Sequence, residues 1–249
     1  MKHIIAFYGS LANSLTNTAL TPVSDTLLGT RGSTLVAPEN LIFRRAFGFG
    51  ATLTEARINV PSMRAITLPR LYPVEKASAV SNNPPILDWN DFGPTVLAGE
   101  GIGIDATTTI GGSNPDATYG LLWVGRPLEQ APVGPVYTMK ATAAAALSAG
   151  VWVNATPTME QDLPAGRYAI IGCDAYGTGL VAARFAFPGQ LMRPGILCQQ
   201  AAGEFDQGEQ RFGKLGKFGE FTNIALPTMD FLGATGTAQT IYMDLVKIG

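Results

Sequence analysis

The chain matches itself when its sequence is shifted by 127 residues. The shift lays residues 50–61, GATLTEARINVP, over residues 177–188, GTGLVAARFAFP, and five of the twelve positions are identical. Upstream, the strand-like residues 41–43 fall on the strand-like residues 168–170. A chain that repeats a strand pattern in this way is expected to fold as two copies of one β unit, joined head to tail.

The alternation of side chains is the same in both copies of the repeat. Apolar residues occupy every second position, which is the period of a strand with one buried face. The apolar positions are Ala56, Ile58 and Val60 in the first copy and Ala183, Phe185 and Phe187 in the second. Each copy then ends on a proline, which cannot donate a hydrogen bond to a sheet. We predict that the two triplets fill equivalent cores.

Glycine and proline punctuate the whole sequence. The 29 Gly and 17 Pro divide it into short segments rich in Val, Ile, Thr and aromatic residues, a pattern typical of an all-β protein. Residues 141–150 have the best helix propensity, but strand-like residues flank them on both sides, so we interpret them as a hairpin. The predicted fold class is therefore all-β, with tandem antiparallel sandwiches.

The two halves have a natural boundary. Each half closes on a predicted strand after a loop rich in Gly and Thr, over residues 118–124 and 240–248. The Pro-rich residues 126–135 lie between the halves and have the composition of a linker. We place the first unit, with an N-terminal arm, in residues 1–130 and the second in residues 131–249, which are ordinary domain sizes.

The charge content favours self-association over binding to polyanions. Charged residues make up 14% of the chain, against about 25% in typical soluble domains, so small polar and apolar groups must cover much of the surface. The formal net charge of −2 provides no field that would attract phosphate backbones. No run of about 18 apolar residues is present, so no membrane-spanning helix is predicted.

The residues used in most catalytic sites are scarce. His3 is the single histidine, and we expect it to lie at a mobile terminus, which excludes Ser-His-Asp and Cys-His systems and histidine-based metal sites. Cys173 and Cys198 are interpreted as two buried free thiols, although one bridge between them stays open. We therefore predict no catalytic residue, no metal site, no cofactor and no enzyme activity.

Two further polar groups have alternative interpretations. Five acids fall in one loop-rich stretch, and we interpret them as solvated loop residues rather than a glycosidase pair or a calcium site. They are Asp88, Asp91, Glu100, Asp105 and Asp116. Residues 211–218, RFGKLGKF, interleave cations with aromatic rings, which suits single-stranded nucleic acid. A glycine-rich loop whose phenylalanines pack inward is preferred, because the whole chain is acidic.

Arg57 and Arg184 occupy equivalent positions in the repeat, on the outward phase of the predicted strands. One interpretation is that they make equivalent bidentate contacts, across an interface or within each unit. The other is that each is a solvated arginine on a strand face. Both interpretations stay open, and we regard these arginines as candidate structural or interface residues.

Three segments of the second half resemble the double jelly-roll major capsid proteins of tailless icosahedral phages and viruses. They are residues 163–172, LPAGRYAIIG, residues 183–190, ARFAFPGQ, and residues 193–195, RPG. The resemblance rests on strand and turn patterning, and it reaches the first half through the internal repeat. Arg193, in the third segment, is a further candidate interface residue.

The resemblance implies two tandem antiparallel jelly-roll barrels related by internal duplication, each with eight strands. It implies a structural protein whose homotrimers form pseudo-hexagonal capsomers that tile an icosahedral shell over an internal membrane or genome. The expected partners are copies of the chain and other virion proteins, with no sequence-specific nucleic acid. The expected location is the virion, after assembly in the host cytoplasm.

Two other functions are weighed against the shell. The first is a tandem jelly-roll module that binds carbohydrate or a receptor, in which Trp89, Trp123 or Trp152 would offer an exposed platform for sugars. The second is an enzyme that uses carboxylates alone on the same scaffold, which the single histidine makes the least favoured.

Overall fold

The computed structural model describes residues 3–12, 15–64, 70–81, 83–89, 92–109, 116–199 and 208–249. Regular structure in these residues is nearly all β-strand, and the helical segments among them are α1 (Pro61–Arg64) and the 3₁₀ turn η1 (Gly208–Gln210). The predicted all-β class is confirmed. In this part of the chain no helix is long and apolar enough to cross a bilayer.

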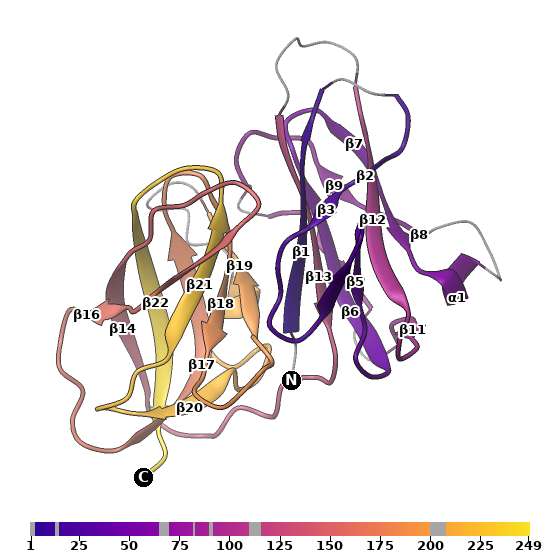
Figure 1. Ribbon diagram of the computed structural model, residues 1–249. Helices are drawn as coiled ribbons and strands as arrows, with labels where there is room; N and C mark the ends of the chain where they lie inside the picture. The colour runs from indigo at the N-terminus through magenta and orange to yellow at the C-terminus, as the bar shows by residue number, and fades with distance from the viewer. Residues whose placement is uncertain are drawn as a thin grey trace. The chain divides into compact units, whose positions relative to one another are not determined.

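The chain divides into two compact units, which we call the N-terminal unit (residues 3–126) and the C-terminal unit (residues 127–249). The N-terminal unit consists of two sheets (Figure 1). The strands of its first sheet are β1 (His3–Leu11), β3 (Thr21–Pro22), β6 (Leu41–Phe49), β9 (Val74–Glu75), β10 (Leu87–Asp88), β11 (Thr95–Val96) and β13 (Asp116–Val124). Their order is β10-β6-β13-β1-β3, and β9 and β11 also pair with β6.

The second sheet of the N-terminal unit has six strands. They are β2 (Thr18–Ala19), β4 (Gly29–Arg31), β5 (Thr34–Val36), β7 (Leu53–Asn59), β8 (Arg70–Tyr72) and β12 (Gly101–Thr108). Their order is β4-β5-β12-β7-β8, and β2 also pairs with β12. All pairs in the unit are antiparallel except the short parallel pair of β6 with β9.

The C-terminal unit also consists of two sheets. The first contains β14 (Val136–Ala144), β16 (Thr158–Met159), β17 (Arg167–Tyr176), β20 (Gly219–Thr222) and β22 (Ala238–Lys247), and the second contains β15 (Trp152–Ala155), β18 (Leu180–Ala186), β19 (Gly195–Leu197) and β21 (Thr228–Gly233). The orders are β16-β14-β22-β17-β20 and β15-β21-β18-β19, with all pairs antiparallel.

The two units have the same strand order. In the first sheets, β3-β1-β13-β6 corresponds to β16-β14-β22-β17, so the first long strand of each unit lies beside its last. In the second sheets, β12-β7-β8 corresponds to β21-β18-β19. The chain crosses between the sheets of a unit from β6 to β7 and from β12 to β13, and likewise from β17 to β18 and from β21 to β22. This is the connectivity of a jelly roll, and each unit is a jelly-roll sandwich.

The two predicted triplets lie in the cores of their units. Ala56, Ile58 and Val60 are buried in the core of the N-terminal unit, and Ala183, Phe185 and Phe187 in that of the C-terminal unit. The side-chain phase of β7 and β18 is therefore confirmed. The closing strands were also correctly located, since β13 and β22 contain most of the residues that the sequence assigned to them.

Residues 141–150 do not form a hairpin. β14 ends at Ala144 and β15 begins at Trp152, but the two strands belong to different sheets, where they pair with β22 and β21. The connection crosses from one sheet of the sandwich to the other. The helix propensity of the alanines is overridden because Ala141 and Ala143 occupy inward positions on β14 and pack into the core.

The N-terminal residues are a strand and not an arm. β1 begins at His3, and all nine of its residues pair with β13. Its first five residues are buried. The boundary between the units lies after Arg126, slightly before the boundary drawn from the sequence, and both fall in the Pro-rich passage.

Candidate functional site

Arg57 and Arg184 each lie opposite an aspartate. Arg57, on β7, is the direct cross-strand partner of Asp105 on β12. Arg184, on β18, is the direct partner of Asp230 on β21. Because β7 and β12 correspond to β18 and β21 in strand order, the two units repeat an Arg-Asp pair at one place in the fold.

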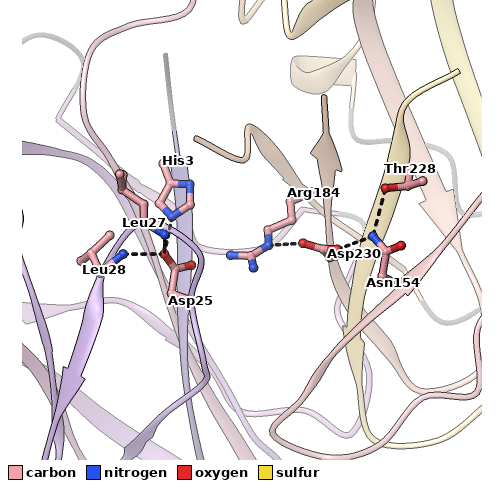
Figure 2. A network of polar contacts seen from close by, with 8 residues as sticks. All are labelled: His3, Asp25, Leu27, Leu28, Asn154, Arg184, Thr228 and Asp230. Carbon is pink, nitrogen blue, oxygen red and sulfur yellow. Dashed lines mark hydrogen bonds and ion pairs between the residues drawn. The ribbon is translucent and has the colours of Figure 1, made fainter. Parts of the chain in front are cut away.

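In the C-terminal unit this pair is buried. Arg184 is 1% exposed, and its Nε donates to Oδ2 of Asp230 at 2.9 Å. Nδ2 of Asn154 donates to the other carboxylate oxygen at 2.7 Å and lies 3.0 Å from the hydroxyl of Thr228, as Figure 2 shows. The guanidinium carbon lies 4.2 Å from the ring centroid of Trp152, which gives a cation–π contact. Arg184 is therefore a structural residue of its unit.

In the N-terminal unit the corresponding pair is open. Nη2 of Arg57 donates to Oε2 of Glu55 at 2.9 Å, along the same strand. Oδ2 of Asp105 accepts from Nδ2 of Asn59 at 3.1 Å. The Arg57 side chain is 31% exposed to solvent. The solvated interpretation is thus wrong for Arg184, whereas Arg57 is a half-exposed strand residue.

Arg193 is half-buried in the segment that joins β18 to β19. It lines an open hollow of about 410 Å³ at one end of the C-terminal unit. Leu191, which is exposed, and Leu226, from the loop before β21, line the same hollow. The structure therefore places Arg193 at this surface hollow, two residues before Gly195, the cross-strand partner of Arg184.

A bidentate ion pair in the C-terminal unit was not expected from the sequence. Arg211 reaches Asp244 on β22 through two bonds, Nε to Oδ2 at 2.6 Å and Nη2 to Oδ1 at 2.7 Å. The Asp244 side chain is fully buried and also accepts from the hydroxyl of Thr138 and the N–H of Phe212. Burial alone would raise the pKa of Asp244, but these hydrogen bonds and the Arg211 charge lower it.

Arg211 was a residue of the cationic and aromatic segment, and its use in an ion pair favours the loop interpretation of that segment. The two phenylalanines of the segment differ in burial. Phe218 is buried in the core, as predicted, but Phe212 is exposed and has a positive φ of 54°. The outward phase of Asp244 on the predicted closing strand is a signal that could have suggested the pair.

Asp174, on β17, is a buried carboxyl group beside this ion pair. Its Oδ1 accepts from the N–H of Ala175 at 2.8 Å, while Oδ2 is buried with no hydrogen-bond partner among the described residues. Burial raises its pKa to about 6, and the nearby Asp244 contributes to the rise, while Arg211 and the Ala175 N–H oppose it.

His3 is a buried residue and not part of a mobile terminus. Its Nε2 lies 2.9 Å from Oδ1 of Asp25, and the same oxygen accepts from the N–H groups of Leu27 and Leu28 (Figure 2). His3 and Asp25 therefore join the start of β1 to the loop after β3. The earlier expectation failed because a residue near the end of a chain is buried when its strand is internal to a sheet.

None of the three predicted tryptophan platforms is fully exposed, since Trp123 is buried and Trp89 and Trp152 are half-buried. Trp89 packs against the core with its ring 6.2 Å from that of Phe43, and Trp152 lies against Arg184. The sugar-binding alternative is thus without a fully exposed tryptophan platform.

The loop acids Asp88 and Glu100 have structural partners, and both thiols are buried. Asp88 pairs with Arg45, and Glu100 accepts from the hydroxyl and the N–H of Ser62, while Asp91 lies outside the described residues. Cys173 and Cys198 are both free and buried, as predicted, and burial raises the pKa of each thiol. Across the part of the chain that the structure describes, no three His, Cys, Asp or Glu residues gather where they could hold a metal ion.

Comparison with known proteins gives one remote likeness. No protein-family model matches the chain, and no curated protein matches it. Among solved structures the chain is similar to the major capsid protein P2 from bacteriophage PM2, with 10% sequence identity and a TM-score of 0.24, over 100% of this chain and 98% of the other. At this TM-score the likeness does not assign the chain to a family.

Proposed function

We propose that the chain is a structural protein, a major capsid protein that trimerises into pseudo-hexagonal capsomers and tiles an icosahedral virion shell. The observation that carries the proposal is the shared strand order of the two units. A ring of three such chains would contain six modules of one fold, and six similar modules around a centre form a near-hexagonal tile. Such a tile has equivalent edges for neighbours on every side.

The surfaces of both units suit contacts with other protein. Only 14% of the residues are charged, and each unit exposes several large apolar side chains. They include Leu71, Phe92 and Leu97 in the N-terminal unit and Val133, Leu191 and Ile224 in the C-terminal unit. In the proposal these side chains lie at contacts with neighbouring subunits, but apolar residues scattered singly are common on any protein surface, so the proposal does not rest on them. The partners in this proposal are copies of the chain, other virion proteins and an underlying membrane or genome.

The candidate arginines have different roles in the proposal. Arg184 stabilises its own unit, because its charge is paired and buried. Arg57 and Arg193 retain exposed surface and are the candidates for contacts between subunits. Neither role requires catalysis or a cofactor, and the proposed location is the virion, after assembly in the host cytoplasm.

The proposal is tested by the mass and the assemblies of the purified chain. Light scattering coupled to size exclusion should give about 79 kDa, three times the 26.2 kDa chain, or larger species. Negative-stain electron microscopy should show hexagonal tiles or closed shells. A mass of one chain at every concentration up to the solubility limit would overturn the proposal, and glycan-array binding by that monomer would favour the binding module instead.

A further inference from the structure

The outer edge of β14 is open over half of its length. β14 pairs with β22 along all nine of its residues, but on its other side β16 covers it only at Ala141 and Thr142. Val136, Tyr137 and Thr138 are exposed, and they follow an exposed stretch that starts at Val133. A sheet edge of this kind presents unpaired backbone groups to solvent.

The direction of the backbone groups on β14 follows from two hydrogen bonds. The N–H of Ala145 donates to the carbonyl of Thr237, so odd-numbered residues face β22. The carbonyl of Lys140 accepts from the N–H of Glu160, on the β16 side, so even-numbered residues face outward. Val136 and Thr138 therefore direct their N–H and C=O groups away from the sheet, and no described residue bonds to these groups.

In the N-terminal unit the corresponding residues of β1, His3 to Ile5, are buried. There the N–H of Val23, just after β3, donates to the carbonyl of Ala6 on β1, as Glu160 does to Lys140. The chain then stays beside β1, where Asp25 bonds to His3. In the C-terminal unit the residue at the place of Asp25 is Asp162, three residues beyond β16, and it is exposed. The open edge is thus a structural difference between the two jelly rolls at equivalent strands.

The chemistry of the open edge suits a second copy of itself. Its one charged residue, Lys140, is paired with Glu160, and Val133, Val136 and Tyr137 are apolar and exposed. In an antiparallel pair centred on Tyr137, Val136 of each copy would face Thr138 of the other. The four outward N–H groups and four outward C=O groups would then form four hydrogen bonds. The two Tyr137 side chains would lie next to each other, a favourable cross-strand pair.

We infer that β14 is a self-association edge, at which two copies of the chain join their first C-terminal sheets through antiparallel pairing of residues 136–138. The contact is small compared with the roughly 800 Å² per partner of a stable complex, so it is weak in isolation and acts together with other contacts. The pairing rests on the edge itself and requires neither a trimer nor a shell.

The experiment traps this register with a disulfide. In the proposed pair Tyr137 is a non-hydrogen-bonded position, with the two Cα atoms about 4.5 Å apart, which is within the range that a disulfide spans. Under mild oxidation the Tyr137→Cys protein should form a cross-linked dimer about tenfold faster than Ala144→Cys, an exposed control on the same strand. The native Cys173 and Cys198 are buried and should not contribute.

A backbone variant tests the hydrogen bonds. Val136→Pro in the Tyr137→Cys protein removes one outward donor per copy without touching the β22 side, and should slow cross-linking roughly tenfold relative to Val136→Thr. Equal cross-linking of Tyr137→Cys and Ala144→Cys, no cross-link in a folded Tyr137→Cys protein, or an unchanged rate for Val136→Pro would each overturn the inference. A trimer mass with no β14 cross-link would refute the edge and leave the shell proposal standing.

Discussion

Replacing Arg184 by alanine should destabilise the chain far more than replacing Arg57, although the two occupy one position in the repeat. Arg184→Ala leaves the Asp230 carboxylate buried, with Asn154 as its remaining side-chain donor, and removes the cation–π contact with Trp152. Loss of one partner from a buried ion pair costs about 3–5 kcal/mol. Arg57 pairs with Glu55 at the surface, where such a pair contributes about 0–1 kcal/mol.

The assay is urea unfolding followed by far-UV circular dichroism, with Arg57→Ala as the matched control. The difference between the two variants should be about 3 kcal/mol, or more than a hundredfold in the unfolding equilibrium constant. The double variant Arg184→Met with Asp230→Leu should recover most of the loss, because it leaves no unpaired charge. Losses that agree within about 0.5 kcal/mol for the two alanine variants would refute the argument from burial.

The buried carboxyl group of Asp174 and the two buried thiols lead to two further predictions. Because the pKa of Asp174 is raised to about 6 in the folded state, its contribution to stability falls as pH rises through that value. Asp174→Asn should therefore melt at a higher temperature than the parent at pH 8, with a gain that shrinks toward pH 5; a gain independent of pH contradicts this. Cys173 and Cys198 should not react with a chromogenic disulfide reagent until the chain is unfolded, when both should titrate.

The core of each unit could be predicted because burial on a strand follows a period of two. Ala56 and Phe185 are buried for the reason that the alternation suggested, and the strand phase remains readable although few identities survive. The structure also decides between the two alternatives left for the thiols, since Cys173 and Cys198 are free and one bridge between them had stayed open.

What the sequence could not predict depends on contacts between distant residues. The outward phase of Arg184 is no guide to its exposure, because Trp152 and Asp230 reach it from other strands. For the pair of Arg211 with Asp244, the phase of Asp244 on its strand indicates an outward carboxylate but does not identify its partner, which is 33 residues away. A local pattern likewise cannot tell whether the strand after β14 pairs with it or crosses to the other sheet, and the crossing was mistaken for a hairpin.

The order of strands in the C-terminal unit also constrains how it forms during synthesis. β22 is the last strand of this unit along the chain, yet it lies between β14 and β17, and its contact with β14 joins residues about a hundred positions apart. Pairings of such long range form slowly. Until residues 238–247 emerge from the ribosome, β14 and β17 lack the strand that joins them. The edges that later pair with β22 are then exposed. During this interval the C-terminal unit has unpaired strand edges, which make a partly folded chain prone to aggregation.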